Sequence, residues 1–242
     1  MTTRQKTIIV TGASQGIGAA VATLFLERGY NVVGNSRRIT QRNELPASES
    51  LALVEGDIGL ASTSERIVGT ALDRFGSVDA LVNNAGLFFV KPFTEYTPDD
   101  FRLLSSTNLE GFIHTTQVVM EQMLSQQLGG SVVSITASLV DHPLAAVTAS
   151  LPMLTKGGID AISRSLAMEY APQAIRVNVV AAGIVDTPMH ENNPKEFLRT
   201  LSPLGQISEA RDIAEAVFYL TEARQITGEV LHVDGGAHLG RW

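Results

Sequence analysis

The segment from Thr11 to Gly18, with the sequence TGASQGIG, constrains the fold of this chain more than any other segment. It follows a short, apolar, β-branched run over residues 7–10 that is typical of a buried strand. Apolar residues then recur at helical spacing until Gly29. A strand, a glycine-rich turn and a helix in this order form the first half of a dinucleotide-binding βαβ unit, with the pyrophosphate at the start of the helix.

The three glycines of this segment have different expected roles. Gly12 allows a sharp turn, Gly16 lets the backbone approach a pyrophosphate, and Gly18 lets the helix pack closely on the sheet. Their spacing, G-x-x-x-G-x-G, differs from the commonest dinucleotide fingerprint, and an ordinary strand-to-helix turn is the alternative interpretation. The residues of this segment that we expect to bind a cofactor are Gly12, Ser14, Gln15, Gly16, Ile17 and Gly18.

The composition is typical of one globular domain over residues 1–242. A net charge of -7 argues against nucleic acid or an anionic membrane as a partner. The chain has no cysteine, which excludes disulfides, thiolate metal sites and a cysteine nucleophile, and we expect no metal site. The segment Met1–Lys6 is polar, and no apolar run reaches the roughly 18 residues of a membrane span. We therefore expect a cytoplasmic protein without a signal peptide.

Strand and helix patterns alternate along the chain. After the first strand, further strands are expected over residues 31–34, 51–54, 79–82, 131–136, 175–180 and 229–233. After the first helix, further helices are expected over residues 62–75, 99–127 (in one or two pieces), 149–170 and 208–220. This order predicts an α/β fold, a single Rossmann-type doubly wound parallel sheet of seven strands with helices on both faces. Ligands bind such sheets beyond the carboxyl ends of the strands.

The end of the second strand indicates which dinucleotide to expect. The acidic residue that would bind a ribose 2′-hydroxyl, about 20 residues past the glycines, is missing. Ser36, Arg37 and Arg38 occupy this place. Cations here suit a 2′-phosphate, so we expect NADP(H) rather than NAD(H). Two solvated surface arginines are the alternative.

Four segments resemble the short-chain dehydrogenase/reductases, and they are spread along essentially the whole chain. They are the glycine turn, NNAG at residues 83–86, RVNVVAAGIVDT at 176–187 and ITGEVLHVDGG at 226–236. The resemblance implies an NAD(P)-dependent oxidoreductase that moves a hydride to or from a carbonyl or alcohol carbon. Family members usually have Pro-Gly where this chain has Ala182-Gly183. The further cofactor-binding residues that the resemblance implies are Asp57, Ile58, Asn84, Ala85, Gly86, Lys156, Gly183, Ile184 and Thr187.

The resemblance also implies a catalytic set, from which one member is missing. Asn108 matches the residue that supports a water-linked proton path, and Ser138 matches the one that orients the substrate carbonyl. Lys156 matches the lysine that lowers the pKa of a catalytic tyrosine, but Pro152 stands at the tyrosine position. If Ser150 caps the helix, the proline lies in the first turn, where its missing N–H is tolerated. The chain's four tyrosines all lie elsewhere, at Tyr30, Tyr96, Tyr170 and Tyr219.

Three functions are compatible with this set. The first is a redox enzyme whose proton donor is Ser138, Lys156, His142 or an ordered water. The second is an NADP(H)-binding pseudoenzyme or regulatory protein, and the third is a lyase or isomerase on the same fold. Retention of Asn108, Ser138 and Lys156 favours catalysis, whereas the missing tyrosine favours binding alone.

A lid segment at about residues 188–203 and the loops around it suggest a largely apolar pocket for a small or medium carbonyl or alcohol. The family resemblance implies that helices over residues 107–127 and 150–170 pair between subunits, so we expect a homodimer or homotetramer. The side chains expected around the pocket are Leu87, Phe88, Phe89, Leu139, Val140, Leu144, Met189, His190, Phe197 and Leu198.

Overall fold

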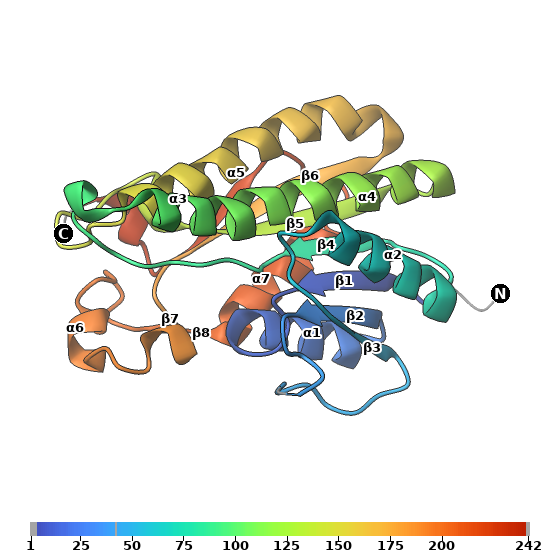
Figure 1. Ribbon diagram of the computed structural model, residues 1–242, viewed down its shortest axis with the longest axis horizontal. Helices are drawn as coiled ribbons and strands as arrows, with labels where there is room; N and C mark the ends of the chain where they lie inside the picture. The colour runs from blue at the N-terminus through green and yellow to red at the C-terminus, as the bar shows by residue number, and fades with distance from the viewer. Residues whose placement is uncertain (1–3, 42, 241–242) are drawn as a thin grey trace.

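The computed structural model describes residues 4–41 and 43–240, so the remaining positions of the predicted domain over residues 1–242, including the first half of Met1–Lys6, lie outside the described residues. Seven parallel strands form one sheet in the order β3-β2-β1-β4-β5-β6-β9 (Figure 1). This confirms the predicted doubly wound α/β fold. The strands are β1 (Thr7–Thr11), β2 (Asn31–Ser36), β3 (Leu51–Glu55), β4 (Ala80–Asn83), β5 (Gly130–Ala137), β6 (Ile175–Ala182) and β9 (Val230–Val233).

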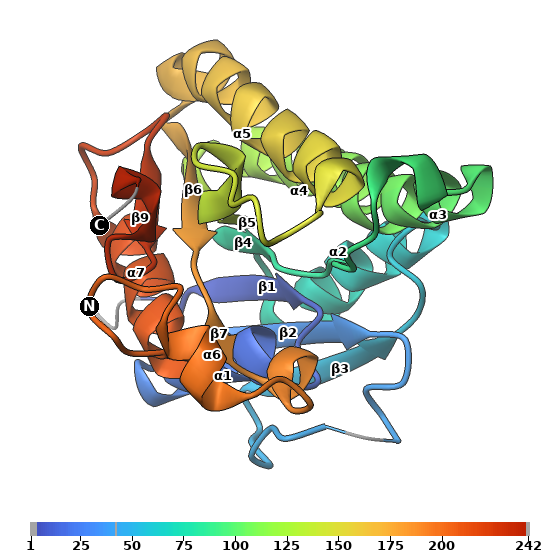
Figure 2. The same ribbon diagram turned by 90° about the vertical axis from the view of Figure 1, so that its left-hand side faces the viewer.

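Helices cover both faces of the sheet, as Figures 1 and 2 show. On one face, α1 (Gly16–Glu27) packs beside α7 (Ala210–Glu222). On the other face lie α2 (Ala61–Phe75), α4 (Gly111–Gln126) and α5 (Ser150–Tyr170). The central strands are apolar on both sides because each face of the sheet is buried against helices, which gives two cores separated by the sheet.

The predicted helix over residues 99–127 consists of three consecutive pieces. It begins with α3 (Pro98–Leu104), where Thr97 and Asp100 form a capping box. A π-helical segment, Ser105–Glu110, connects it to α4. The wider π turn contains Asn108, whose side chain is buried. Such turns are frequent at functional sites.

Two helix starts differ from the prediction. Ser208–Glu209 is a short strand, β8, that pairs with β7 (Val185–Asp186), so the helix predicted over residues 208–220 begins at Ala210. The Ser208 amide donates to the carbonyl of Ile184, the residue before β7, at 3.1 Å. Helix α5 begins at Ser150 rather than being capped by it, and the residue before it, Ala149, has no side chain that can cap a helix. Pro152 is the third helical residue, where no intrahelical N–H bond is required.

The carboxyl ends of the strands meet at one edge of the sheet, which Figure 2 views from the side of the lid. The predicted lid segment, at about residues 188–203, contains α6 (Lys195–Arg199), near β7 and β8. Among residues 4–41 and 43–240, no helix has both the length and the apolar character needed to cross a bilayer.

Candidate active site

A cavity of about 600 Å³ lies beyond the carboxyl ends of the strands. It extends from the glycine turn after β1 to the loop after β5 and the lid. Every predicted cofactor-binding residue lines it except Arg38, which is exposed beside β2 and outside the cavity. The predicted residues that line it are Gly12, Ser14, Gln15, Gly16, Ile17, Gly18, Arg37, Asp57, Ile58, Asn84, Ala85, Gly86, Lys156, Gly183, Ile184 and Thr187.

The glycine turn forms a cradle that side chains would fill. Gly12 has a φ of +67°, and a Cβ at this position would lie 2.8 Å from Nδ2 of Asn84. A Cβ on Gly18 would overlap the carbonyl oxygen of Gly12. Helix α1 begins at Gly16 without an acidic residue in its first turn, so its N–H groups are available to an anion. The shape and polarity of this cradle therefore fit a pyrophosphate.

The NNAG segment holds the glycine turn in place. Nδ2 of Asn84 donates to the carbonyl oxygens of Thr11 at 2.9 Å and Gly12 at 3.1 Å. The Thr11 hydroxyl in turn accepts the backbone N–H groups of Asn84 at 3.1 Å and Ala85 at 3.0 Å. Thr11 is a supporting residue that the sequence analysis did not assign, although it is the first residue of the glycine motif.

The ends of β2 and β3 line the cavity beside the glycine turn. The Ser36 hydroxyl lies 3.1 Å from that of Ser14, which joins the end of β2 to the glycine turn. Arg37 follows with its exposed side chain at the cavity edge. The Asp57 carboxylate accepts the N–H of Gly59 at 3.0 Å, which fixes the turn after β3. This end of the cavity can therefore present a guanidinium to an anionic group.

Ser138 and Lys156 line the same cavity at its opposite end. Lys156 Nζ donates to the carbonyl oxygen of Ile135 at 2.8 Å. Gly86 leaves room beside the ammonium, since a Cβ there would lie 3.2 Å from Nζ. Burial lowers the pKa of Lys156 to about 8, and the Asp160 carboxylate opposes part of this shift. An amine with this pKa can exchange a proton near neutral pH.

Asn108, the third predicted catalytic residue, lies behind the cavity rather than in its lining. Its Oδ1 accepts the N–H of Leu87 at 2.8 Å, and its Nδ2 donates to the carbonyl of Leu87 at 3.0 Å. Nδ2 also donates to the Thr155 hydroxyl at 3.0 Å. The Asn108 side chain therefore ties the segment after β4 to α5, one residue before Lys156, and makes no direct contact with the cavity.

No tyrosine from the described part of the chain lines the cavity. Pro152 is buried in the first turn of α5. The Tyr30 hydroxyl bonds to Glu222, and the Tyr96 hydroxyl donates to the carbonyl of Phe89 at 3.0 Å. Tyr170 ends α5, and Tyr219 is exposed on α7. The described part of the chain therefore supplies no phenol to this cavity.

The end of the cavity beside the predicted lid segment is mostly apolar. All the predicted pocket residues line it except Val140. The Val140 side chain lies against α5 instead, since a Cβ on Gly157 would lie 3.4 Å from it. His142, His190 and Asn193 add polar groups near the lid. The apolar side chains that line this end are Leu87, Phe88, Phe89, Val90, Leu139, Leu144, Val147, Met189, Phe197, Leu198 and Leu201.

Comparison with known proteins gives the family. A family model described as enoyl-(acyl carrier protein) reductase matches residues 12–238. The chain belongs to the short-chain dehydrogenase/reductase family. Carbonyl reductase family member 4 of Xenopus laevis is 36% identical to this short-chain dehydrogenase/reductase, over 97% of this chain and 98% of the relative. The 3-oxoacyl-[acyl-carrier-protein] reductase FabG of Vibrio harveyi is 34% identical over 97% and 98%.

Solved structures of short-chain dehydrogenase/reductases have the same fold. A 3-ketoacyl-(acyl-carrier-protein) reductase from Brucella melitensis, complexed with NADH, superposes with a TM-score of 0.88 at 26% identity over 98% of this chain and 100% of that one. ElxO with NADP bound superposes with a TM-score of 0.87 at 25% identity over 96% and 98%. Both neighbours therefore hold a nicotinamide dinucleotide on this fold.

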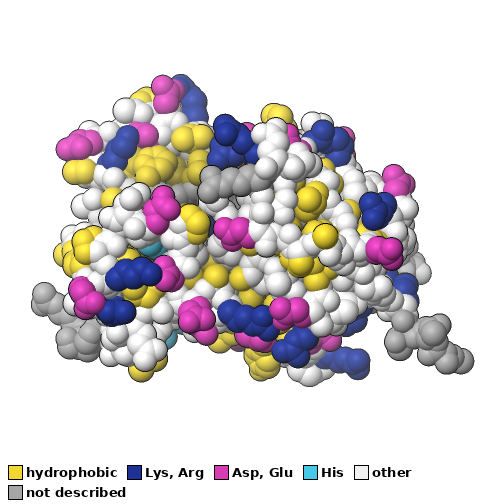
Figure 3. All heavy atoms as spheres, turned by 90° about the horizontal axis from the view of Figure 1, so that it is seen from below, with side chains coloured by type: hydrophobic (Ala, Val, Ile, Leu, Met, Phe, Trp, Pro, Cys, Tyr) yellow, Lys and Arg dark blue, Asp and Glu magenta, His cyan; other side chains and the backbone are white. Residues whose placement is uncertain are grey.

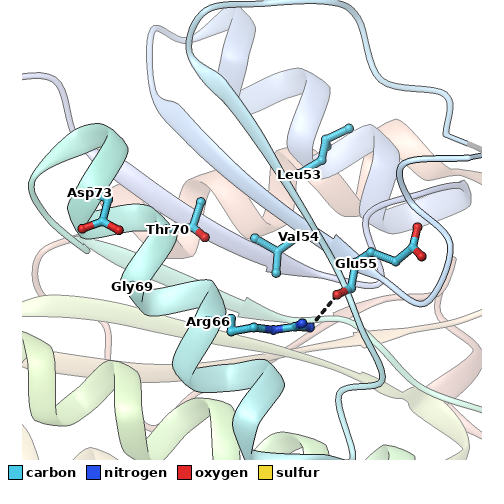
Figure 4. A pocket seen from close by; sticks show the side chains of 7 residues that line it. All are labelled: Leu53, Val54, Glu55, Arg66, Gly69, Thr70 and Asp73. Carbon is cyan, nitrogen blue, oxygen red and sulfur yellow. Dashed lines mark hydrogen bonds between the residues drawn. The ribbon is translucent and has the colours of Figure 1, made fainter.

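A second depression, of about 430 Å³, lies between β3 and α2 in this short-chain dehydrogenase/reductase (Figure 4). The Arg66 guanidinium donates to the carbonyl of Glu55 at 2.6 Å, so this cation already has an acceptor there.

Within residues 4–41 and 43–240, no group of three His, Cys, Asp or Glu side chains is arranged to hold a metal ion. Figure 3 shows cationic and anionic side chains interspersed over the face that it views.

Proposed function

We propose that this chain is an NADP(H)-dependent oxidoreductase that acts on a small or medium, largely apolar carbonyl or alcohol. One observation carries the proposal. A single cavity contains the glycine cradle and Arg37 at one end, and Ser138 and Lys156 at the other. The relatives named as carbonyl and oxoacyl reductases, and the neighbours solved with NADH and NADP, support it.

The cofactor would bind along the length of this cavity. The N–H groups at the start of α1, around Gly16, would hold the pyrophosphate. Arg37 would pair with a 2′-phosphate, and Asp57 and Ile58 would lie against the adenine. Gly183, Ile184 and Thr187 would line the nicotinamide end. When bound, the cofactor supplies or accepts the hydride.

The residues around the substrate would orient the carbonyl and supply the proton. Ser138 would donate a hydrogen bond to the carbonyl oxygen, because its side chain lines the cavity at the end of β5. Lys156 would give the proton to this oxygen during reduction and take it back during oxidation. Its pKa of about 8 keeps the ammonium populated at neutral pH while making it a stronger acid than an exposed lysine.

A titration of cofactor affinity tests the first half of the proposal. We expect NADPH to bind more tightly than NADH, and Arg37→Asp to weaken NADPH binding about ten- to a hundredfold while leaving NADH binding nearly unchanged. This range corresponds to the loss of one charge-assisted hydrogen bond, about 1.5–3 kcal/mol. Arg38→Asp is the matched control, because the neighbouring arginine lies outside the cavity. Equal affinities for the two cofactors, or equal effects of the two variants, would contradict the NADP(H) preference.

Pro152 favours a second candidate function, because no tyrosine of the described residues lines the cavity to act as a general acid. The chain would then bind NADP(H) without turning over, or would hold it while catalysing a non-redox reaction such as dehydration or isomerisation. Tight NADPH binding without oxidation of the cofactor by any ketone would favour this alternative. Losing a general acid typically costs about 10²–10⁴ in rate. The assay therefore has to detect slow single turnovers.

We also propose that the protein forms a homodimer or homotetramer through α4 and α5. Both helices have large apolar side chains on their exposed surfaces, including Ile113 on α4 and Met168 on α5, which is 80% exposed. Sedimentation at micromolar concentration tests this. A monomer under these conditions would contradict it, and a dimer that dissociates in Met168→Glu would place α5 in the interface.

A further inference from the structure

Buried polar side chains without partners lie between α5 and β5, behind the wall of the cavity. Asp160 is only 3% exposed, and neither of its carboxylate oxygens has a hydrogen-bond partner among the described residues. The hydroxyls of Ser134, Thr136 and Ser163 are buried and equally without partners there. Ser134 and Thr136 share one face of β5, whereas Asp160 and Ser163 share one face of α5. Hereafter these four side chains are called the Asp160 cluster.

The Asp160 cluster adjoins Lys156. The lysine lies four residues before Asp160 on the same helix, a spacing that brings Cβ atoms within about 5–6 Å. The acceptor of its ammonium, the carbonyl of Ile135, belongs to the residue between Ser134 and Thr136 on β5. The ammonium and the carboxyl group are therefore held by the same two elements.

The charged groups around Asp160 favour pairing of its carboxylate with the Lys156 ammonium. Burial raises the pKa of the Asp160 carboxyl above its usual value, and the Thr136 hydroxyl opposes part of this shift. Asp141, in the loop after β5, raises it further, whereas Arg164 and Lys156 on α5 lower it. Asp141 already bonds to Nε2 of His232 at 2.8 Å, and Arg164 is exposed. Lys156 is therefore the buried cation that Asp160 can neutralise.

A buried carboxyl group without a partner is unfavourable, so its presence needs a physical reason. We propose that Asp160 is a positioning residue that keeps Lys156 protonated inside the cavity. The rotatable hydroxyls of the Asp160 cluster can donate to the carboxylate, which stabilises its charged form beside the ammonium. The catalytic consequence rests on the proposed function, but the proton occupancy of Lys156 does not.

Competitive labelling of Lys156 tests the proposal without substrate or cofactor. The folded protein is acetylated with acetic anhydride over a range of pH, and the reactivity of Lys156 relative to other lysines is measured by mass spectrometry. We expect the midpoint of Lys156 reactivity to fall by about one pH unit in Asp160→Asn, which from a pKa of about 8 is a roughly fivefold rise in the neutral amine at pH 7. Asp160→Glu restores the midpoint, at least in part. The matched control is Ser163→Ala, which removes a member of the cluster without removing its charge.

An unchanged midpoint in folded Asp160→Asn overturns the proposal, and so does an equal shift in Asp160→Asn and Ser163→Ala. If Asp160→Asn does not fold, the protein with its native sequence provides the test by NMR with ¹³C-labelled aspartate and lysine. The Asp160 carboxyl signal is expected to respond when Lys156 loses its proton, and the absence of this response overturns the proposal. If the midpoint of Lys156 reactivity falls in Asp160→Asn but the protein with its native sequence never oxidises NADPH, the proposed function is refuted and this inference still holds.

Discussion

Replacing Lys156 by methionine is predicted to stabilise the protein while removing its proposed acid. Burial lowers the pKa of this lysine from 10.5 to about 8. The native state therefore holds the proton less tightly than the unfolded chain, and below pH 8 this difference costs about 3 kcal/mol at roughly 1.4 kcal/mol per tenfold change in proton affinity. The lost hydrogen bond to the carbonyl of Ile135 and the lost cation beside the buried Asp160 carboxyl offset part of the gain. We expect Lys156→Met to be more stable by about 1–2 kcal/mol at pH 7.

The difference in stability between Lys156→Met and the parent is expected to change with pH. Between pH 8 and 10.5 the unfolded chain binds more protons than the native protein at this site, so the stability of the unsubstituted protein rises with pH. The advantage of Lys156→Met should therefore shrink across this window. Urea unfolding at several pH values measures it, with Lys195→Met, which replaces an exposed lysine paired with Asp186, as the control. A variant that is less stable than the parent at pH 7, or an advantage that does not change with pH, would refute the reasoning.

Two further predictions concern backbone space and the missing phenol. In Gly18→Ala the new methyl would overlap the Gly12 carbonyl, so we expect thermal stability to fall and NADPH binding to weaken at least tenfold. Gly69 lies in the middle of α2, and no atom lies within 4 Å of a Cβ built on it. Gly69→Ala should therefore raise the free energy of unfolding by about 0.5–1 kcal/mol. Wild-type affinity in Gly18→Ala would show that the cradle does not hold the cofactor. Pro152→Tyr should increase kcat for ketone reduction by about tenfold or more, since a general acid contributes about 10²–10⁴. An unchanged kcat in a folded Pro152→Tyr protein would argue against a proton-limited reaction.

The sequence predicted the fold well because the periodicity of its elements is strong. Alternating strands and helices predict parallel strands joined by right-handed crossovers, with helices on both faces of the sheet, but not the order of the strands. The β7–β8 pair was not predicted, because two-residue strands have no periodicity to detect. The start of α7 was wrong for the same reason, since Ser208 and Glu209 belong to that pair.

That the glycine turn and the ends of the neighbouring strands line one cavity could be predicted, because their residues lie in contiguous motifs. Arg38 was predicted to bind the cofactor, and this stays a prediction, but its side chain lies outside the cavity; sequence alone does not show which of two adjacent arginines lines a cavity at a strand end. Asn108 was placed on the right helix, but its tertiary contacts with Leu87 and Thr155 could not be foreseen. The Asp160 cluster was missed because its members come from two elements and follow no known motif.

The most direct test of the account is a single-turnover experiment with NADPH and a panel of small apolar ketones, followed by nicotinamide absorbance. The account predicts oxidation of the cofactor by at least one ketone, with rates that fall at least a hundredfold in Ser138→Ala and in Lys156→Met. It also predicts that the rate falls as the pH rises through about 8, as Lys156 loses its proton. Tight NADPH binding with no oxidation by any ketone, or oxidation that is unaffected by Lys156→Met, would contradict it.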